Sequence, residues 1–391
     1  MKEMLPGPEP QLELPAGRER IIPVAGTLLD GNELRYVTEC IQSNWVSSEG
    51  PFVRRFEEAF ARAAGCRFGV ACSSGTAALH LLLASIGLRP GDEVILPAFT
   101  MIATANAVTY TGATPVLVDA EPLTWNIDVS LVARRITERT KAIIAVHTYG
   151  HPVDMSPLRE LAQQRGLWLL EDAAEGHGAV YRGRPVGSLG DAAIFSFYGN
   201  KIVTTGEGGM VVTDDERIAQ LARQLRGHAF STDRHFWHEH LGFNYRMTNL
   251  QAAVGLAQTE RLEVLVEARR RNARRYREAL AGVTGLTLPI ERADSKNVFW
   301  MFALLVEDGF GCTRDELRNA LAARGIETRT MFVPIHVQPI YGQLFRGQTF
   351  PVAEELCRKG LYLPSGPGLR GEDIDYVAAE IARVREGALV A

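Results

Sequence analysis

Short, continuous runs of apolar residues recur between about residues 66 and 213 and predict buried β-strands. Strands that are covered on both faces read as unbroken Val, Ile and Leu runs. Segments with helical spacing lie between several of these runs, as at 77–85 and 157–164. The expected strands are Phe68–Cys72, Glu93–Leu96, Pro115–Val118, Ala142–His147, Leu167–Leu170, Ala192–Phe197 and Met210–Thr213. The alternation of strand and helix implies parallel crossovers and predicts an α/β fold with a mostly parallel sheet.

The pattern changes toward both ends of the chain. Residues 1–20 are rich in Pro, Gly and Glu, which is typical of a loose arm. The proline-free stretch Thr248–Leu280 predicts one connecting helix, and its basic run at 269–275 predicts a solvated face. A strand near Phe299–Val306 and a helix near Arg314–Ala323 follow. We expect an arm over 1–25, a large α/β domain over 26–250, and the connecting helix with a smaller α+β domain over 251–391.

Composition narrows the class of protein. The 391 residues carry a net charge of -4, which argues against nucleic acid or a membrane surface as a partner. Apolar runs stay below the roughly 18 residues of a membrane span, and the N-terminus lacks the pattern of a signal peptide. The five cysteines form no C-x-x-C pair, which is typical of free thiols in a reducing compartment. These features predict a soluble, cytoplasmic protein of enzyme size.

The strongest chemical signal is a lysine in a turn. The stretch Phe195-Ser-Phe-Tyr-Gly-Asn-Lys201 ends a predicted strand, and the glycine-rich stretch 204–209 follows it. A lysine becomes a nucleophile toward carbonyl carbons when burial or a neighbouring cation lowers its pKa. A lone lysine in such a turn is more commonly a solvated surface residue. The glycine-rich flank, which lets the backbone pass close to a ligand, favours the catalytic interpretation.

Two other strand ends carry polar residues. Asp172 closes the apolar run of Leu169-Leu-Glu-Asp172, at the carboxyl end where α/β folds bind ligands. Ser74-Gly-Thr76 opens a helix after another strand, and a helix N-terminus binds phosphate readily. Each motif alone also fits an ordinary helix cap.

Together the three motifs resemble the pyridoxal-phosphate (PLP) enzymes of the aspartate-aminotransferase fold, in which a large sheet domain precedes a smaller one. The detailed sequence resembles the nucleotide-sugar aminotransferases of the DegT type over nearly the whole chain, from Asn44 onward. The stretches that carry the resemblance are 195–209, 243–253 and 362–369. Within that family they are most similar to the branch that forms perosamine from GDP-4-keto-6-deoxymannose.

The resemblance implies a role for each matching residue. Lys201 bonds to the cofactor and moves the proton, and Asp172 pairs with the pyridine nitrogen. Asn244 reaches the phosphate in the partner subunit, so the family pattern implies a homodimer with a shared site. The phosphate is held by Ser74, Gly75, Thr76 and Ser196. Substrate contacts are expected from Arg246, Arg329 and His336. Trp45 is a further candidate because an aromatic side chain can line a sugar or base pocket.

Two positions depart from the family pattern. The family usually has an aromatic residue stacked on the cofactor ring where this chain has Met101, and Phe99 is the candidate to take its place. A thioether can pack on a ring face, but it does so less rigidly. Many members have Gln where this chain has Glu175, so a carboxylate is expected near the cofactor. Both changes concern cofactor affinity and electronic tuning.

The reaction implied by the family transfers the amino group of glutamate to a keto-sugar nucleotide, with the cofactor alternating between PLP and pyridoxamine phosphate (PMP). Another keto-sugar is an open alternative: a dTDP-linked sugar, a 3-keto sugar or a cyclitol. A PLP-binding regulatory protein without turnover is a second alternative. A sugar dehydratase of this fold would need histidine in place of Lys201. The segment His235-Phe-Trp-His238-Glu-His240 predicts a polar loop, because the spacing suits a metal poorly, and no metal is expected.

Overall fold

A seven-stranded sheet forms the centre of the molecule, and every strand expected from the apolar runs is present. The computed structural model describes residues 4–14, 20–231, 233–234 and 236–390. For residues 388–390 it describes the backbone alone. The strands are β1 (Phe68–Cys72), β2 (Glu93–Pro97), β3 (Thr114–Val118), β4 (Thr140–Val146), β5 (Trp168–Asp172), β8 (Ala192–Ser196) and β9 (Gly209–Thr213). Their side chains are almost all buried, as expected for a sheet with helices on both faces.

Strand order in this sheet decides where the functional residues meet. The order is β1-β9-β8-β5-β4-β2-β3, and β8, β5, β4, β2 and β3 run parallel. Strand β9 is antiparallel to both β8 and β1. Strand β1 therefore points the same way as the parallel strands. The carboxyl ends of β1, β2, β5 and β8 all lie at one edge of the sheet, which is the ligand-binding edge of α/β folds.

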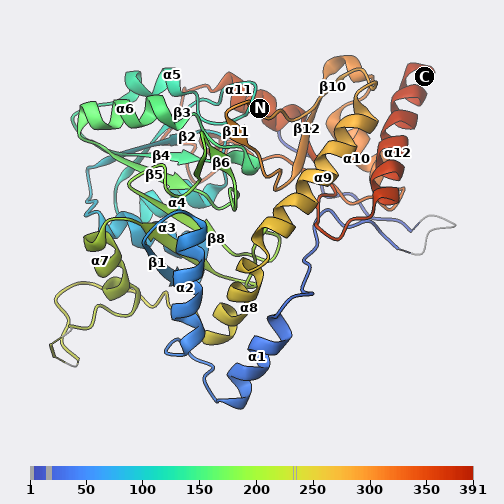
Figure 1. Cartoon of the computed structure of the whole chain (residues 1–391). Helices are drawn as coiled ribbons and strands as arrows, with labels where there is room; N and C mark the ends of the chain where they lie inside the picture. The colour runs from blue at the N-terminus through green and yellow to red at the C-terminus, as the bar shows by residue number, and fades with distance from the viewer. Residues whose placement is uncertain (1–3, 15–19, 232, 235, 391) are drawn as a thin grey trace.

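Helices surround the sheet, as Figure 1 shows. Helix α3 packs against β8 and β9, while α2 packs against β1 and α8. The helices are α1 (Glu33–Gln42), α2 (Pro51–Ala63), α3 (Gly75–Ser85), α4 (Ile102–Tyr110), α5 (Val129–Val132), α6 (Met155–Arg165), α7 (Glu216–Arg226), α8 (Asn249–Thr259), α9 (Leu262–Leu280), α10 (Arg314–Ala322), α11 (Pro351–Lys359) and α12 (Gly371–Val390). Sequence reasoning did not identify α2, which begins with proline at its first position and buries three phenylalanines.

The predicted single helix over Thr248–Leu280 is wrong, because two helices meet there. The break falls between Thr259 and Leu262, where neither glycine nor proline marks it. Tertiary contacts hold the corner: Glu260 accepts a hydrogen bond from the Tyr36 hydroxyl at 2.7 Å, and Arg261 pairs with Asp30. The break lets α8 lie beside α1 and α2, while α9 continues toward strand β12 (Phe302–Val306) of a separate sheet (Figure 1).

The solvated face predicted for the basic run on α9 is also wrong at its first residue. Arg269 is only 2% exposed, whereas Arg271, Arg274 and Arg275 are exposed as predicted. The difference arises because α9 packs one side against the core, with Leu265 and Ala273 buried on it.

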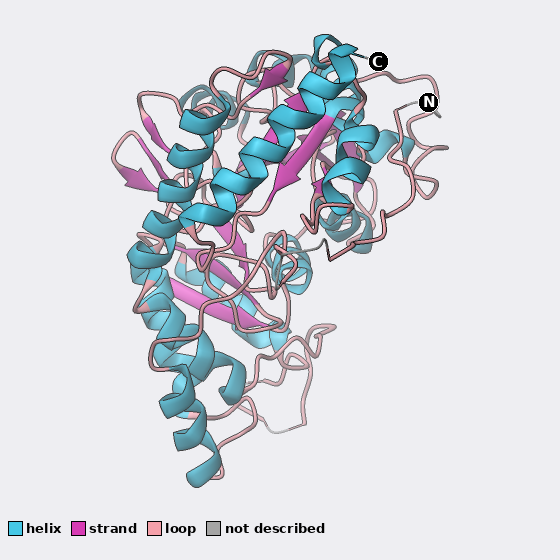
Figure 2. Cartoon of the chain, turned by 90° about the vertical axis from the view of Figure 1, so that its right-hand side faces the viewer, coloured by secondary structure: helices cyan, strands magenta, loops and turns pink. Residues whose placement is uncertain are grey.

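Two smaller sheets complete the fold, and Figure 2 shows the resulting division into an upper and a lower part. The four-stranded sheet, in spatial order, contains β10 (Leu286–Thr287), β12 (Phe302–Val306), β14 (Gly360–Leu363) and β13 (Arg329–Thr330). The three-stranded sheet contains β11 (Ser295–Lys296), β6 (Val180–Tyr181) and β7 (Arg184–Pro185). A separate hydrophobic core, which includes Phe302 and Leu317, lies between β12, α9, α10 and α12.

Residues 4–14 of the N-terminal arm contact the C-terminal part of the chain at several points, although most of their side chains are exposed. Met4 is buried, and its carbonyl accepts a hydrogen bond from the Cys357 thiol at 3.5 Å. Glu9 lies 2.5 Å from the buried guanidinium of Arg318, and Glu13 donates its backbone N–H to Ala322 at 3.1 Å. These contacts with the C-terminal part of the chain hold the arm in place, which its composition alone does not predict.

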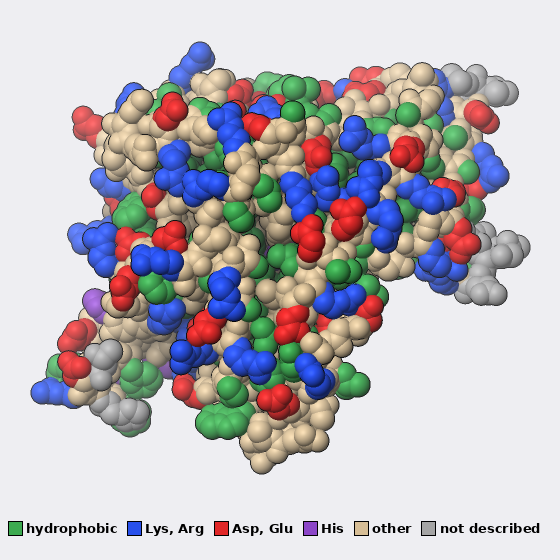
Figure 3. All heavy atoms as spheres, in the orientation of Figure 1, with side chains coloured by type: hydrophobic (Ala, Val, Ile, Leu, Met, Phe, Trp, Pro, Cys, Tyr) green, Lys and Arg blue, Asp and Glu red, His purple; other side chains and the backbone are tan. Residues whose placement is uncertain are grey.

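The surface shows intermingled charges. On the face in Figure 3, basic and acidic side chains alternate over the whole outline instead of gathering into one patch. Within the part of the chain that the structure describes, none of the helices is both long and apolar enough to cross a membrane.

Candidate active site

A cavity of about 460 Å³ opens at the carboxyl edge of the central sheet. Residues from the ends of β1, β5 and β8 line it together with Trp300, Phe332 and Tyr362. The central sheet and the C-terminal part of the chain therefore both contribute to the cavity. The lining residues are Ser74, Gly75, Thr76, Leu79, Thr100, Met101, Ala103, Val146, Asp172, Ala174, Glu175, Ile194, Ser196, Tyr198, Asn200, Lys201, Glu207, Trp300, Phe332 and Tyr362. Eight of the nine residues predicted to contact the cofactor are among them, and Asn244 is the exception.

Lys201 meets two buried carboxyl groups in this cavity. Its side chain is 11% exposed, and its Nζ lies 3.7 Å from Oε1 of Glu175. The other carboxyl oxygen of Glu175 accepts the backbone N–H of Tyr149 at 2.7 Å. Asp172 accepts hydrogen bonds from the Thr104 hydroxyl at 2.8 Å and from the backbone N–H of Ala174 at 3.2 Å. Both carboxyl groups are therefore held in fixed orientations.

Burial dominates the electrostatics of the three groups. It lowers the pKa of Lys201, although Glu175 and Asp172 favour the ammonium form. Burial raises the pKa of Asp172, against the hydrogen bond from Thr104, and raises the pKa of Glu175 to about 7, against the nearby lysine. A lower pKa increases the fraction of the lysine that is in its neutral, nucleophilic form at a given pH.

The start of α3 forms a cradle for an anion. Ser74 caps the helix by accepting the N–H of Ala77 at 3.1 Å, which leaves earlier N–H groups free of helical partners. Gly75 is needed for space, since a Cβ atom there would lie 2.7 Å from the Cβ of Ser196. The cradle, the hydroxyl of Ser196 and a carboxylate at Asp172 match the phosphate and ring nitrogen of PLP, with Lys201 for its aldehyde. These residues fit the cofactor.

The aromatic residues of the cavity were missed by sequence reasoning. Met101 lines it with 52% of its side chain exposed, as expected of a residue at a ligand face. Phe99 does not take the place of an aromatic residue at 101, because it is fully buried away from the lining. Trp300, Phe332 and Tyr362 line the cavity instead. They lie more than 90 residues after Lys201 in the chain. The packing of the four-stranded sheet and its flanking segments brings them to the cavity.

Five predicted residues lie outside the cavity of this single chain. Trp45 and Asn244 are exposed, and Arg246 donates to the side chain of Asn244 at 3.1 Å. Arg329 pairs with Glu327 at 2.6 Å and with Glu9 at 3.4 Å. His336 is buried against Glu354 at 3.1 Å. Their substrate and cofactor roles stay predictions.

The histidine segment lies in the loop after α7. His238 and His240 are exposed, and His238 bonds to the carbonyl of His228 at 2.7 Å, while His235 lies outside the described residues. Over the described parts of the chain, no group of three or more His, Cys, Asp or Glu side chains is arranged to hold a metal ion.

Comparison with known proteins identifies the family of the chain. The model of the DegT/DnrJ/EryC1/StrS aminotransferase family matches residues 28–382. GDP-perosamine synthase of Caulobacter vibrioides is 48% identical over 93% of this chain and 98% of its own length. The dTDP-3-amino-3,4,6-trideoxy-alpha-D-glucose transaminase of Streptomyces venezuelae is 42% identical over 82% of this chain and 83% of its own length. The crystal structure of S. venezuelae DesV, 39% identical, superposes with a TM-score of 0.86 over 91% of this chain and 94% of that one. The chain therefore belongs to the DegT/DnrJ/EryC1/StrS aminotransferase family and is a PLP-dependent aminotransferase.

Proposed function

We propose that this chain transfers the amino group of glutamate to GDP-4-keto-6-deoxymannose in the cytoplasm and so forms GDP-perosamine. The observation that carries the proposal is the likeness to GDP-perosamine synthase, which extends over 98% of that protein. The S. venezuelae transaminase for a dTDP-linked sugar matches less closely and over less of its length. A dTDP-linked keto-sugar is therefore the second candidate substrate.

The proposal gives each cavity residue a role that suits its position. PLP supplies, when bound, an aldehyde carbon and a protonated ring that delocalises negative charge. Asp172 accepts hydrogen bonds from Thr104 and Ala174, and its carboxylate would keep a proton on the ring nitrogen. The first N–H groups of α3 and the Ser196 hydroxyl orient the phosphate. Lys201 would hold the cofactor through Nζ and would move the proton at the α-carbon of glutamate.

A homodimer with shared sites is part of the proposal. Asn244 lies outside the cavity of its own chain, and several large apolar side chains are exposed nearby or on α1, among them Leu241 at 89% and Leu34 at 81%. Large exposed apolar side chains are typical of surfaces that another chain covers. Neither Lys201→Ala nor Asn244→Asp should be active alone, and mixing the two variants should restore part of the activity. If the mixture stays inactive after subunit exchange, the shared site is refuted.

The direct test follows release of 2-oxoglutarate from glutamate with purified protein, PLP and GDP-4-keto-6-deoxymannose, with mass spectrometry of the sugar product. Release that depends on the sugar and disappears in Lys201→Ala supports the proposal. Lys141→Ala, an exposed lysine of β4, is the matched control and should keep full activity. Release only with a dTDP-linked keto-sugar would establish the second candidate. PLP binding without turnover on either sugar would favour the regulatory alternative.

A further inference from the structure

A fully buried arginine lies behind the lysine cavity. The guanidinium of Arg269, on α9, donates to the backbone carbonyls of Trp300 at 2.7 Å, Ser365 at 3.1 Å and Asn200 at 3.5 Å. Among the described residues, none of the carboxylates lies within ion-pair distance of it. A buried cation is costly unless hydrogen bonds replace its water. Carbonyl groups of three distant segments provide them here, and one of the three precedes Lys201 directly.

Trp300 contacts the same carbonyl and the lysine itself. Its indole Nε1 donates to the carbonyl of Asn200 at 2.9 Å, so this oxygen accepts from both Trp300 and Arg269. The Nζ of Lys201 lies 3.7 Å from the centroid of the indole ring. A cation at that distance from an aromatic face is attracted to it. The backbone before the lysine and the end of its side chain are thus held by one residue.

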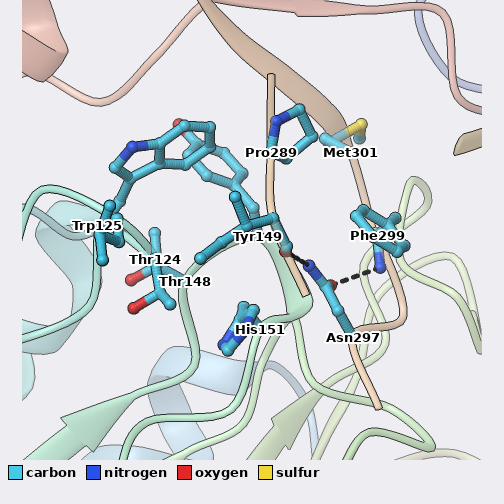
Figure 4. Close-up of a pocket in the computed structure, with 11 residues that line it drawn as sticks. Thr124, Trp125, Thr148, Tyr149, His151, Pro289, Asn297, Phe299 and Met301 are labelled. Carbon is cyan, nitrogen blue, oxygen red and sulfur yellow. Dashed lines mark hydrogen bonds between the residues drawn. The ribbon is translucent and has the colours of Figure 1, made fainter. Parts of the chain in front are cut away.

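The segment that carries Trp300 is itself braced. The ring of Trp300 stacks on Tyr149 with 6.2 Å between centroids, and the backbone N–H of Trp300 donates to the Tyr149 carbonyl at 3.0 Å. Figure 4 shows the side chain of Asn297 accepting the backbone N–H of Phe299, at 2.8 Å. Asn297 also donates to the carbonyl of Ile290 at 3.1 Å. Phe299 and Tyr149 have φ angles of 46° and 52°, a region that large side chains avoid. Such backbone persists only where the surroundings over-determine it.

We propose that Arg269 and Trp300 are positioning residues for Lys201: together they fix the Asn200 carbonyl, and thereby the turn that presents the lysine to the cofactor. The inference rests on the assignment of Lys201 as the cofactor lysine. The buried guanidinium also acts through charge, because a nearby cation disfavours the ammonium form of Lys201 and adds to the effect of burial on its pKa. Arg269 therefore has two separable effects, on geometry and on protonation.

The test compares Arg269→Met with Arg318→Met, a matched change at a buried arginine of α10 that is 1% exposed and pairs with Glu9. Two readouts are measured on the PLP-loaded proteins: the pH midpoint of the visible absorbance, which reports the protonation of the lysine-linked nitrogen, and the separate values of kcat and KM. Removal of the cation should raise the midpoint in Arg269→Met relative to both the wild type and Arg318→Met. Its kcat should fall at least about tenfold with little change in the KM for glutamate, because a misplaced lysine affects the chemical step. Arg318→Met should change thermal stability alone.

Two further variants keep the inference testable if Arg269→Met does not fold. Arg269→Lys retains a charge but cannot reach three carbonyls, so its midpoint should move less than its kcat. Trp300→Phe retains a ring but loses the N–H donor, and it should lower kcat in the same way. If the midpoint and kcat of every folded variant match the wild type, the positioning role is refuted. If the wild type itself shows no PLP absorbance that Lys201→Ala removes, the assignment of Lys201 fails instead.

Discussion

Replacing Glu175 with glutamine should make Lys201 easier to deprotonate. The two side chains lie 3.7 Å apart and are both largely buried. At that separation and an effective dielectric constant of about 20, two unit charges attract each other by about 4 kcal/mol. One pKa unit corresponds to about 1.4 kcal/mol, so a full charge accounts for at most about 3 units. Because the charge of Glu175 is complete only above its own pKa of about 7, the fall in the pKa of Lys201 in Glu175→Gln should stay below that limit.

The assay measures how fast the cofactor-free protein captures PLP as a function of pH, since only the neutral amine attacks an aldehyde. The midpoint of this rate profile should move to lower pH in Glu175→Gln. Glu207→Gln is the matched control, because Glu207 lines the same cavity but is exposed, and solvent screens its charge. A midpoint that stays in place or rises in Glu175→Gln would refute the electrostatic reasoning.

Three other outcomes are expected. Gly75→Ala should weaken PLP binding by about tenfold or more, because the added Cβ would press on Ser196. Gly282→Ala is the control, since Gly282 has open space around it and its replacement should leave PLP binding unchanged. Equal PLP affinities of the two variants in a titration would contradict the anion cradle. Met101→Tyr should tighten PLP binding by about two- to tenfold, the value of one aromatic contact of about 0.5–1.5 kcal/mol, and weaker binding would show that the thioether is the better partner. Burial lowers the pKa of His177 to about 3. Below the usual histidine pKa of about 6.5, only the unfolded chain binds this proton, and the free energy of unfolding is therefore about 2 kcal/mol lower at pH 5. His177→Phe should remove that loss in urea unfolding at pH 5 relative to pH 7.5, and an unchanged pH dependence would contradict the prediction.

The arginine of α9 illustrates how sequence reasoning can fail. A basic run on a long helix suggests a solvated face, and Arg271, Arg274 and Arg275 follow that rule. Arg269 does not, because its side of the helix faces the carbonyls of Trp300 and Asn200. Periodicity identifies the apolar stripe of a helix, but it does not reveal a polar side chain whose partners are backbone groups from other segments.

The sequence by itself determined the seven central strands and the family, along with the three motifs that end β1, β5 and β8. These features are local, because continuous apolar runs and short polar motifs depend little on distant residues. Tertiary structure decided the break between α8 and α9, the antiparallel direction of β9, the packing of residues 4–14 and the aromatic wall of Trp300, Phe332 and Tyr362. Each of these features depends on contacts between segments far apart in the chain. The free energy of such contacts cannot be inferred from the local sequence pattern.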